Sequence, residues 1–432
     1  MEWWLLLLLF FSVLIILMLL GVPIAYSLGF TSLLLGYFFI GPKILYIFGT
    51  VAYGQMNVAA LATVPLFVLM AEFIIRSGAA RDGFDMLAKW MGSLPGGLAL
   101  ASQMICTIFA AVCGASTAAT AVIGGMCVPE LLNRNYDKRM AVGSIAAGGA
   151  LAVLIPPSVI LIIYGILSET SIGQLFIGGI IPGLILFALR FFYIIILCSK
   201  YPSLGPPVHA TWQERISSSY KIMPLIFLIF FIFGALYSGI ATATEVAGIG
   251  AFFSMLIAFW YKSLNKKNIS QILLGTVRTT TFIMWILVAA SAFGYVIGYL
   301  QLPQQLANWV ASMGLSKLAV ILFINLLLII LGCVMDPGAI VMIIVPLLIP
   351  LLETVEIDLI WFGVMFVVNM EIAEITPPLG LNLFIMKGVS PPSVSMDDIM
   401  IGSIPFVILD FICLGLVIIF PQLILWLPSK MI

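Results

Sequence analysis

Two proline pairs interrupt long apolar segments of this chain: Leu154-Ile-Pro-Pro-Ser158 and Ile375-Thr-Pro-Pro-Leu-Gly380. They lie near the middle of residues 139–167 and 358–388, stretches that are each long enough for a membrane-spanning helix. Proline has no backbone N–H and restricts the residue before it, so we expect each helix to unwind at its proline pair. Unwound backbone at membrane depth is tolerated only where it is buried in protein or lines a cavity. The two breaks therefore predict a polar site inside a membrane protein.

The composition excludes several classes of protein. Of 432 residues, 63% are hydrophobic and only 8% are charged, whereas a soluble domain carries about 25% charged residues. The 18 basic and 18 acidic residues balance, which argues against nucleic acid as a partner. A single histidine, His209, excludes a histidine-ligated metal site, and the absence of a phosphate-binding G-x-x-x-x-G-K-[ST] motif excludes an ATP site of its own. A soluble enzyme is excluded, and the chain is predicted to be an all-α polytopic membrane protein that lies in the lipid bilayer.

Eight further segments have the length and polarity of uninterrupted membrane spans: 3–20, 22–40, 50–75, 172–198, 222–238, 240–261, 275–300 and 402–428. Two other regions, 96–132 and 318–353, each contain two shorter apolar arms around small, polar or helix-breaking residues. The midpoints of these regions are Gly114-Ala-Ser-Thr117 and Gly332-Cys-Val-Met-Asp-Pro-Gly338. We interpret both regions as re-entrant helical hairpins.

The two halves of the chain match each other. Three landmarks recur at offsets of 217–221 residues: Trp90 and Trp309, Pro129 and Pro346, and Pro156 and Pro377. If the basic loop 133–139 is cytoplasmic, fourteen of the 18 Lys and Arg residues fall on or near that side. The bases of the two hairpins then lie on opposite sides of the membrane. Inverted repeats with broken helices are typical of secondary transporters, whose sites lie near the bilayer midplane.

Helix ends at the hairpin tips and proline breaks supply the expected binding groups. Free N-terminal amides suit an anion, whereas C-terminal carbonyls suit a cation such as Na⁺. Polar side chains stand beside these ends: Ser116 and Thr117 at the first tip, Ser158 after the first break, Asp336 at the second tip, and Thr376 and Asn382 around the second break. The alternatives are structural: the hydroxyls bond within their own helices, and Asp336 caps the second arm.

Other acids lie in or near apolar segments. Glu245 has the capping-box spacing in Thr242-Ala-Thr-Glu245, and Glu72 is placed to pair with Arg76 one turn later. Glu371 and Glu374 precede Thr376 by about one turn and either tune an ion site or carry protons. Asp410, within the last span, requires an internal partner that the sequence does not identify.

At these motifs the chain resembles the large membrane subunit of tripartite ATP-independent periplasmic (TRAP) transporters. The resemblance extends over essentially the whole chain, and Ala243 departs from the family's Thr-Pro-Thr-Glu motif. The matching stretches are Tyr136–Ala141, Gly148–Ser158, Gly178–Gly183, Thr242–Glu245, Met335–Pro337 and Glu374–Asn382.

The resemblance implies an elevator-type, sodium-coupled importer of an organic anion, such as a C4-dicarboxylate or sialic acid, in the bacterial inner membrane. A periplasmic substrate-binding protein would deliver the anion, and a separate small four-helix membrane subunit would brace the scaffold. Carried over from the family, the residues expected to bind Na⁺ are Gly114, Ser116, Pro156, Gly332, Asp336, Thr376 and Pro377, with the glycines and prolines acting through their carbonyls. For the anion we expect Ser116, Thr117, Ser158 and Asn382.

The expected division alternates scaffold and transport segments. The transport domain would comprise 76–168 and 301–390, and the scaffold would comprise 1–75, 169–300 and a closing helix in 391–432. Three other functions stay open at this point. They are a stand-alone sodium- or proton-coupled carboxylate carrier of the wider ion-transporter superfamily, a channel, and an intramembrane enzyme that would have to use Asp336 with Glu374.

Overall fold

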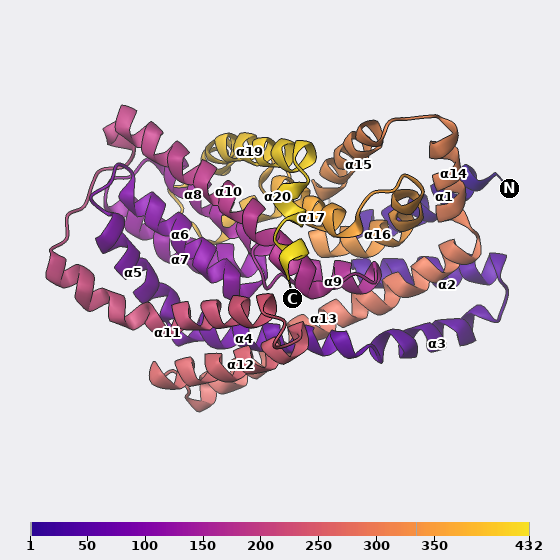
Figure 1. The fold of residues 1–432 in the computed structure, drawn as a ribbon, viewed down its shortest axis with the longest axis horizontal. Helices are drawn as coiled ribbons and strands as arrows, with labels where there is room; N and C mark the ends of the chain where they lie inside the picture. The colour runs from indigo at the N-terminus through magenta and orange to yellow at the C-terminus, as the bar shows by residue number, and fades with distance from the viewer. Residues whose placement is uncertain (1, 334, 432) are drawn as a thin grey trace.

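The computed structural model describes residues 2–333 and 335–431, and this part of the chain forms helices and no β-strand (Figure 1). The α-helices are α1 (Trp3–Leu19), α2 (Ile24–Phe39), α3 (Ile44–Met56), α4 (Thr63–Ser77), α5 (Ala79–Met91), α6 (Gly97–Cys113), α7 (Ser116–Asn133), α8 (Lys138–Ala150), α9 (Val159–Leu167), α10 (Ile172–Lys200), α11 (Trp212–Tyr237), α12 (Ala243–Trp260), α13 (Lys266–Tyr299), α14 (Leu302–Ser312), α15 (Lys317–Gly332), α16 (Pro337–Thr354), α17 (Leu359–Ile375), α18 (Leu381–Val389), α19 (Met396–Ile419) and α20 (Gln422–Leu425).

Seven of the described helices are long and apolar enough to cross a membrane. They are Ala59–Ser77, Ile172–Lys200, Trp212–Tyr237, Ala243–Trp260, Lys266–Tyr299, Pro337–Thr354 and Met396–Ile419. The helices α1 and α2 are equally apolar but have only 17 and 16 residues. The chain is therefore a multi-pass membrane protein.

Two predicted spans are wrong in their boundaries. The segment 50–75 is not one helix, because α3 ends at Met56 and α4 begins at Thr63 after a short 3₁₀ turn. Pro65 explains the restart, since a residue without an N–H is best tolerated in the first turn of a helix. The segment 402–428 is also interrupted: α19 ends at Ile419, two residues before Pro421, which disfavours helical backbone at the residue preceding it.

Both proline breaks are present. After α8 the chain makes a 3₁₀ turn at Leu151–Val153 and resumes as α9, and between α17 and α18 it is non-helical from Thr376 to Gly380. Each predicted hairpin consists of two helices, α6 with α7 and α15 with α16. The second tip includes Val334, which lies outside the described residues. A short helix precedes each pair, α5 with Trp90 and α14 with Trp309; sequence reasoning did not identify these helices.

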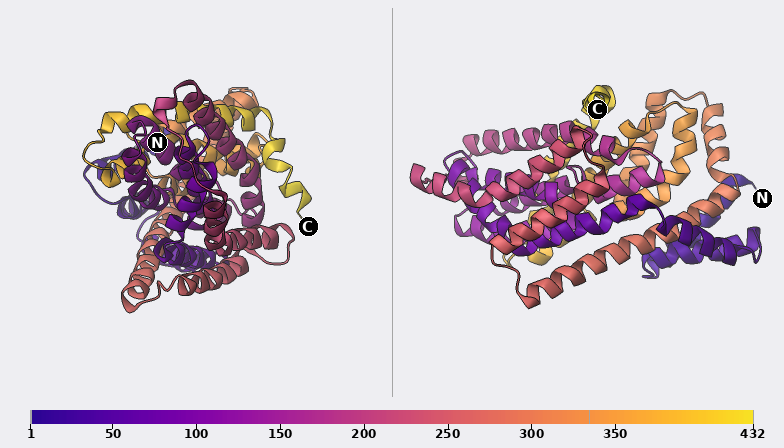
Figure 2. Two further views of the ribbon diagram at one scale, coloured as in Figure 1. Left: turned by 90° about the vertical axis from the view of Figure 1, so that its left-hand side faces the viewer. Right: turned by 60° about the horizontal axis from the view of Figure 1, so that its bottom comes forward.

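The helices pack in two groups. One contains α2, α3, α4, α12 and α13, with α12 lying along α4 and α13 crossing α2, α3 and α4. The other contains α6, α7, α8, α10, α17 and α19, and in it α8 contacts both arms of the first hairpin and also packs closely along α19. Figure 1 shows the pair α6–α7 towards one end of the molecule and α15–α16 towards the other, with α17 between them. The views in Figure 2 show that α13 runs diagonally along the first group.

A buried cluster of charges connects four helices of the second group. The Arg190 guanidinium on α10 donates to Asp410 Oδ1 on α19 at 2.7 and 3.1 Å, and to Glu371 Oε2 on α17 at 3.3 Å. It also donates to the backbone carbonyl of Ala147 on α8 at 2.7 Å. All three charged side chains are fully buried. The expected internal partner of Asp410 is therefore Arg190.

We expect Arg190→Met to lower the free energy of unfolding by about 3–5 kcal/mol, because it removes the cation that pairs with buried carboxylate. The control is Arg134→Met, since Arg134 forms a largely exposed pair with Glu130 at 2.7 Å and should contribute about 0–1 kcal/mol. Denaturant unfolding in detergent, followed by tryptophan fluorescence, measures both variants. Equal, small losses would contradict a structural role for the buried cluster.

Candidate functional site

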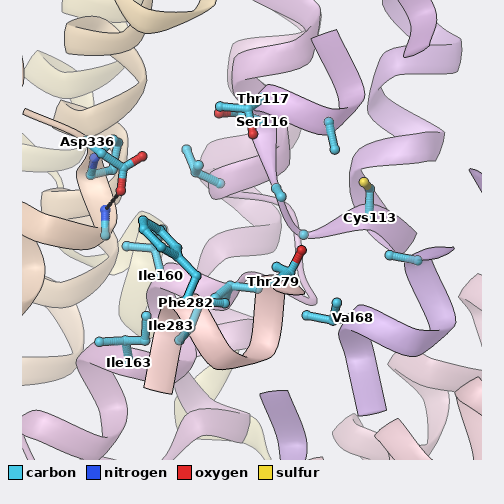
Figure 3. Close-up of a pocket in the computed structure, with 18 of the residues that line it drawn as sticks. Val68, Cys113, Ser116, Thr117, Ile160, Ile163, Thr279, Phe282, Ile283 and Asp336 are labelled. Carbon is cyan, nitrogen blue, oxygen red and sulfur yellow. Dashed lines mark hydrogen bonds between the residues drawn. The ribbon is translucent and has the colours of Figure 1, made fainter. Parts of the chain in front are cut away.

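A cavity of about 320 Å³ lies where the two hairpin tips meet the first group of helices. Its walls come from the first tip (residues 113–118), the second tip (336–338), α9, α4 and α13. In Figure 3, Asp336 lies across the cavity from Ser116 and Thr117, and Ile160 and Phe282 lie below them in this view. The fold thus brings together, at one cavity, two tips that are more than 200 residues apart in the chain.

The first tip is attached to the first proline break. Gly114 has a φ of +63°, which favours glycine, and its carbonyl accepts a hydrogen bond from the Val159 N–H at 3.4 Å. A Cβ at Gly114 would lie 2.5 Å from the Pro157 carbonyl oxygen. Backbone groups of the tip and the break are therefore in direct contact, which only glycine at this position permits.

The same tip is attached to the second broken helix by side chains. The Ser116 hydroxyl donates to Glu374 Oε1 at 2.5 Å, and the Asn382 amide donates to Glu374 Oε2 at 3.4 Å. Glu374 is only 2% exposed, and within the described chain it forms no ion pair with a basic side chain. A buried carboxylate held only by neutral donors is costly unless a cation or a proton neutralises it.

The second tip places a carboxylate on the opposite wall. Asp336 accepts a hydrogen bond from the Gly338 N–H at 2.9 Å and so caps α16, which confirms the N-cap interpretation. Its side chain is nevertheless exposed in the open part of the cavity. The Asp336 carboxylate can therefore cap α16 and face a bound ion at the same time.

The other predicted residues lie around the cavity without lining it. Ser158 bonds the Val153 carbonyl and caps α9, and the Thr376 hydroxyl donates to the Ile372 carbonyl at 2.5 Å, as the structural alternative expected. Gly332 packs against Ala373 so closely that a Cβ would overlap it. The predicted residues that line the cavity are Gly114, Ser116, Thr117 and Asp336; those that do not are Pro156, Ser158, Gly332, Thr376, Pro377 and Asn382.

Sequence reasoning missed the wall formed by α4 and α13. Glu72 was correctly paired with Arg76, at 3.0 Å, but it also lines the cavity, as do Thr279 and Phe282. A signal was present in the three consecutive threonines that begin at Thr279, because such a polar run is unusual inside an apolar span. The capping box of Thr242 and Glu245 is confirmed, and it lies outside this cavity.

The chemistry of the cavity has two components. Carboxylate, hydroxyl and carbonyl oxygens are the ligands that hard cations prefer. The N-termini of α7, α9 and α16 also reach the cavity, and helix N-termini favour anions. Among the described residues no group of three or more His, Cys, Asp or Glu side chains could hold a metal ion alone. A cation here would therefore depend on hydroxyl and backbone oxygens.

Comparison with known proteins places this geometry in a family. Residues 11–423 match the model for the DctM component of tripartite ATP-independent periplasmic transporters. The chain is 33% identical over 370 residues to the C4-dicarboxylate TRAP transporter large permease protein DctM of Pseudomonas aeruginosa, covering 85% of this chain and 86% of that protein. It is 30% identical over 417 residues to the sialic acid TRAP transporter large permease protein SiaM of Vibrio cholerae, covering 95% of each.

Solved structures with a similar fold are also transporters. The YdaH transporter of Alcanivorax borkumensis superposes with a TM-score of 0.63 at 14% identity, covering 89% of this chain and 88% of its own. MtrF of Neisseria gonorrhoeae gives a TM-score of 0.64 at 12% identity, covering 89% and 85%. These likenesses show a shared fold, and the family model and curated relatives show a membrane transporter subunit, in a family that is not enzymatic. The chain belongs to the DctM family, the large permease component of TRAP transporters.

We expect Gly114→Ala to lower the free energy of unfolding by about 1–3 kcal/mol, because alanine is strained at this φ and its Cβ meets the Pro157 carbonyl. Gly298→Ala is the matched control: Gly298 lies inside α13, no atom lies within 4 Å of a Cβ there, and the change should stabilise by about 0.5–1 kcal/mol. Denaturant unfolding of both purified variants tests this. A Gly114→Ala protein as stable as the control would show that the tip and the break are not held together.

Proposed function

We propose that this chain is the transport subunit of a sodium-coupled importer that carries an organic carboxylate across the bacterial inner membrane. The names of its relatives support the substrate class, since they include C4-dicarboxylate, sialic acid and 2,3-diketo-L-gulonate transporters. The observation that carries the proposal is Glu374, a buried acid without a basic partner that joins the first tip to the second broken helix beside the cavity.

The charges around the cavity support coupling to a cation, for which we propose Na⁺. Asp336 and Glu374 line the cavity and repel an incoming carboxylate, and the described lining residues include no Lys, Arg or His. A cation bound first would neutralise this charge, with Ser116 and the Gly114 carbonyl as additional ligands, since of the residues expected to bind Na⁺ only these two and Asp336 line the cavity. The anion would then bind to the helix N-termini, with Thr117 beside it. Binding in this order makes transport of the anion dependent on the cation.

The mechanism we propose is an elevator. The cavity lies between the hairpin tips and the helices α4 and α13, so sliding of the tips and broken helices past α4 and α13 would carry the site across the membrane. In this scheme both hairpins are re-entrant and inverted relative to each other.

The proposed mechanism also changes the expected division of the chain, which placed 169–300 and 391–432 in the scaffold. Because Arg190 ties α10 and α19 to α8 and α17, we propose that these two helices move with the hairpins.

Two partners complete the proposed system. A periplasmic binding protein would deliver the anion, and a small membrane subunit would support the scaffold. The isethionate permease of Oleidesulfovibrio alaskensis, named DctMQ, supports the second partner, because the 32% identical match covers 86% of this chain but only 59% of that protein. The remaining length is sufficient for another subunit in the same polypeptide.

Uptake into proteoliposomes tests the proposal as a whole. Uptake of labelled dicarboxylates or sialic acid is measured in vesicles that contain this chain and its small subunit. The binding protein and an inward Na⁺ gradient are each supplied or left out. We expect uptake only when both are supplied, because the cation must neutralise the cavity and the binding protein must deliver the anion. Uptake by this chain alone, or driven only by a proton gradient, would favour the stand-alone carrier; flux without gradient coupling would indicate a channel.

Variants of the cavity acids test the ion site. We expect Glu374→Gln and Asp336→Asn to raise the Na⁺ concentration for half-maximal uptake about 10–100-fold, as loss of a charged ligand or its support commonly does. Glu130→Gln is the control, because Glu130 pairs with Arg134 on the surface. If Glu374→Gln changes the pH profile of uptake and leaves its Na⁺ dependence intact, the coupling ion at this residue is a proton.

A further inference from the structure

The buried cluster of Arg190, Glu371 and Asp410 has an unbalanced charge. One guanidinium faces two carboxyl groups, and all three side chains are fully buried within a membrane protein. If both carboxyl groups were ionised, the cluster would carry a net charge of −1 in a medium of low dielectric, where an uncompensated ion costs several kcal/mol. The cluster therefore needs one more positive charge than its side chains provide.

The hydrogen bonds distinguish the two acids. Asp410 Oδ1 receives two bonds from Arg190, at 2.7 and 3.1 Å, whereas Glu371 Oε2 receives one, at 3.3 Å. Each acid also has one buried oxygen without a partner, Glu371 Oε1 and Asp410 Oδ2, so the two acids differ in their contacts with Arg190. Short, paired contacts mark an ionised carboxylate, and a single long contact through one oxygen is what the carbonyl oxygen of a neutral acid accepts.

Among the described residues, no other charged group balances the cluster. The charged side chains that act on Glu371 are Arg190 and Asp410, and Glu374 follows it one turn later on the same helix. The buried thiols of Cys106 on α6 and Cys413 on α19 carry no positive charge in either protonation state, and in the described chain α8 contributes the Ala147 carbonyl. Within the described chain, the missing positive charge thus has no source among the side chains around the cluster.

We propose that Glu371 holds a resident proton and that Arg190 and Asp410 form the ion pair beside it. The cluster is then neutral, and the proton lies on Glu371 Oε1, because Glu371 receives the single long contact from Arg190 through its other oxygen. A proton fits better than a metal cation, because the three side chains are fully buried and none lines the cavity through which a hydrated ion could enter. This inference does not depend on the identity of the transported anion or of the coupling ion.

The proton has a consequence for the transport site. Glu371 and Glu374 lie on adjacent turns of α17, so an ionised Glu371 would add a second negative charge close to the cavity. With Glu371 neutral, Glu374 is the acid of this helix that an incoming cation must neutralise. The arrangement also keeps α17 attached to α8, α10 and α19 without bringing net charge into the core.

Infrared spectroscopy and thermal unfolding of the purified protein test the proposal. The measurement is made in a protein that carries Glu374→Gln, which removes the other buried acid of α17. If that variant is unstable, the wild-type protein in saturating Na⁺ serves as the second background. We expect the C=O band of a protonated carboxylic acid at neutral pH. Adding Glu371→Gln should abolish the band and leave the Tm within about 2 °C, because the amide replaces a neutral acid of the same shape.

Asp410→Asn should behave differently. It removes the ionised partner of Arg190, so Glu371 should ionise in its place, and the Tm should fall by about 5 °C or more. Glu130→Gln, at an exposed ion pair, should change neither the band nor the Tm.

Three results would overturn the assignment. Absence of the band in both backgrounds would mean that both acids are ionised, and a bound cation would then balance them. A band that survives Glu371→Gln would place the proton on another residue. A larger Tm loss from Glu371→Gln than from Asp410→Asn would assign the proton to Asp410. If Asp410→Asn fails to fold, the band and the Tm of Glu371→Gln still decide the question.

Discussion

The rest of the structure depends on one constraint: backbone that is not helical inside a membrane must find its hydrogen bonds within the protein. The two proline breaks create such backbone, and the first hairpin tip is hydrogen-bonded beside each of them. The Gly114 carbonyl accepts a hydrogen bond from the Val159 N–H, just after the first break. The Ser116 hydroxyl donates to the Glu374 carboxyl group, just before the second break. The first tip thus joins both breaks, and the cavity lies beside these contacts.

Charge in this protein is placed in two different ways. Around Arg190 it is buried, nearly balanced and closed to solvent, and it ties four helices together. Around Glu374 and Asp336 it is unbalanced by any described side chain and reaches an open cavity. The first arrangement is suited to holding helices in place. The second is the basis of the proposed cation site, because no described basic side chain lines the cavity as a permanent counter-charge.

Several features could be predicted from single stretches of sequence, because their causes are local. Proline pairs break helices wherever they occur, so the interruptions at Pro156 and Pro377 were correct. Capping by Asp336, the capping box at Glu245 and the ion pair of Glu72 with Arg76 depend on residues within one turn and were also correct. The errors at 50–75 and 402–428 came from giving too little weight to single prolines, Pro65 and Pro421.

The sequence by itself determined the membrane class, the two breaks, the paired helices and the family, because apolar length, proline chemistry and short motifs act locally. Only the tertiary structure decided that Arg190 is the partner of Asp410, 220 residues away, and that Glu371 faces this pair while Glu374 faces the cavity. From the sequence alone, Glu371 and Glu374 cannot be told apart, because they are acids of the same kind one turn apart on one helix. They differ because helix rotation directs each towards different packed neighbours, and long-range packing is set by the whole chain.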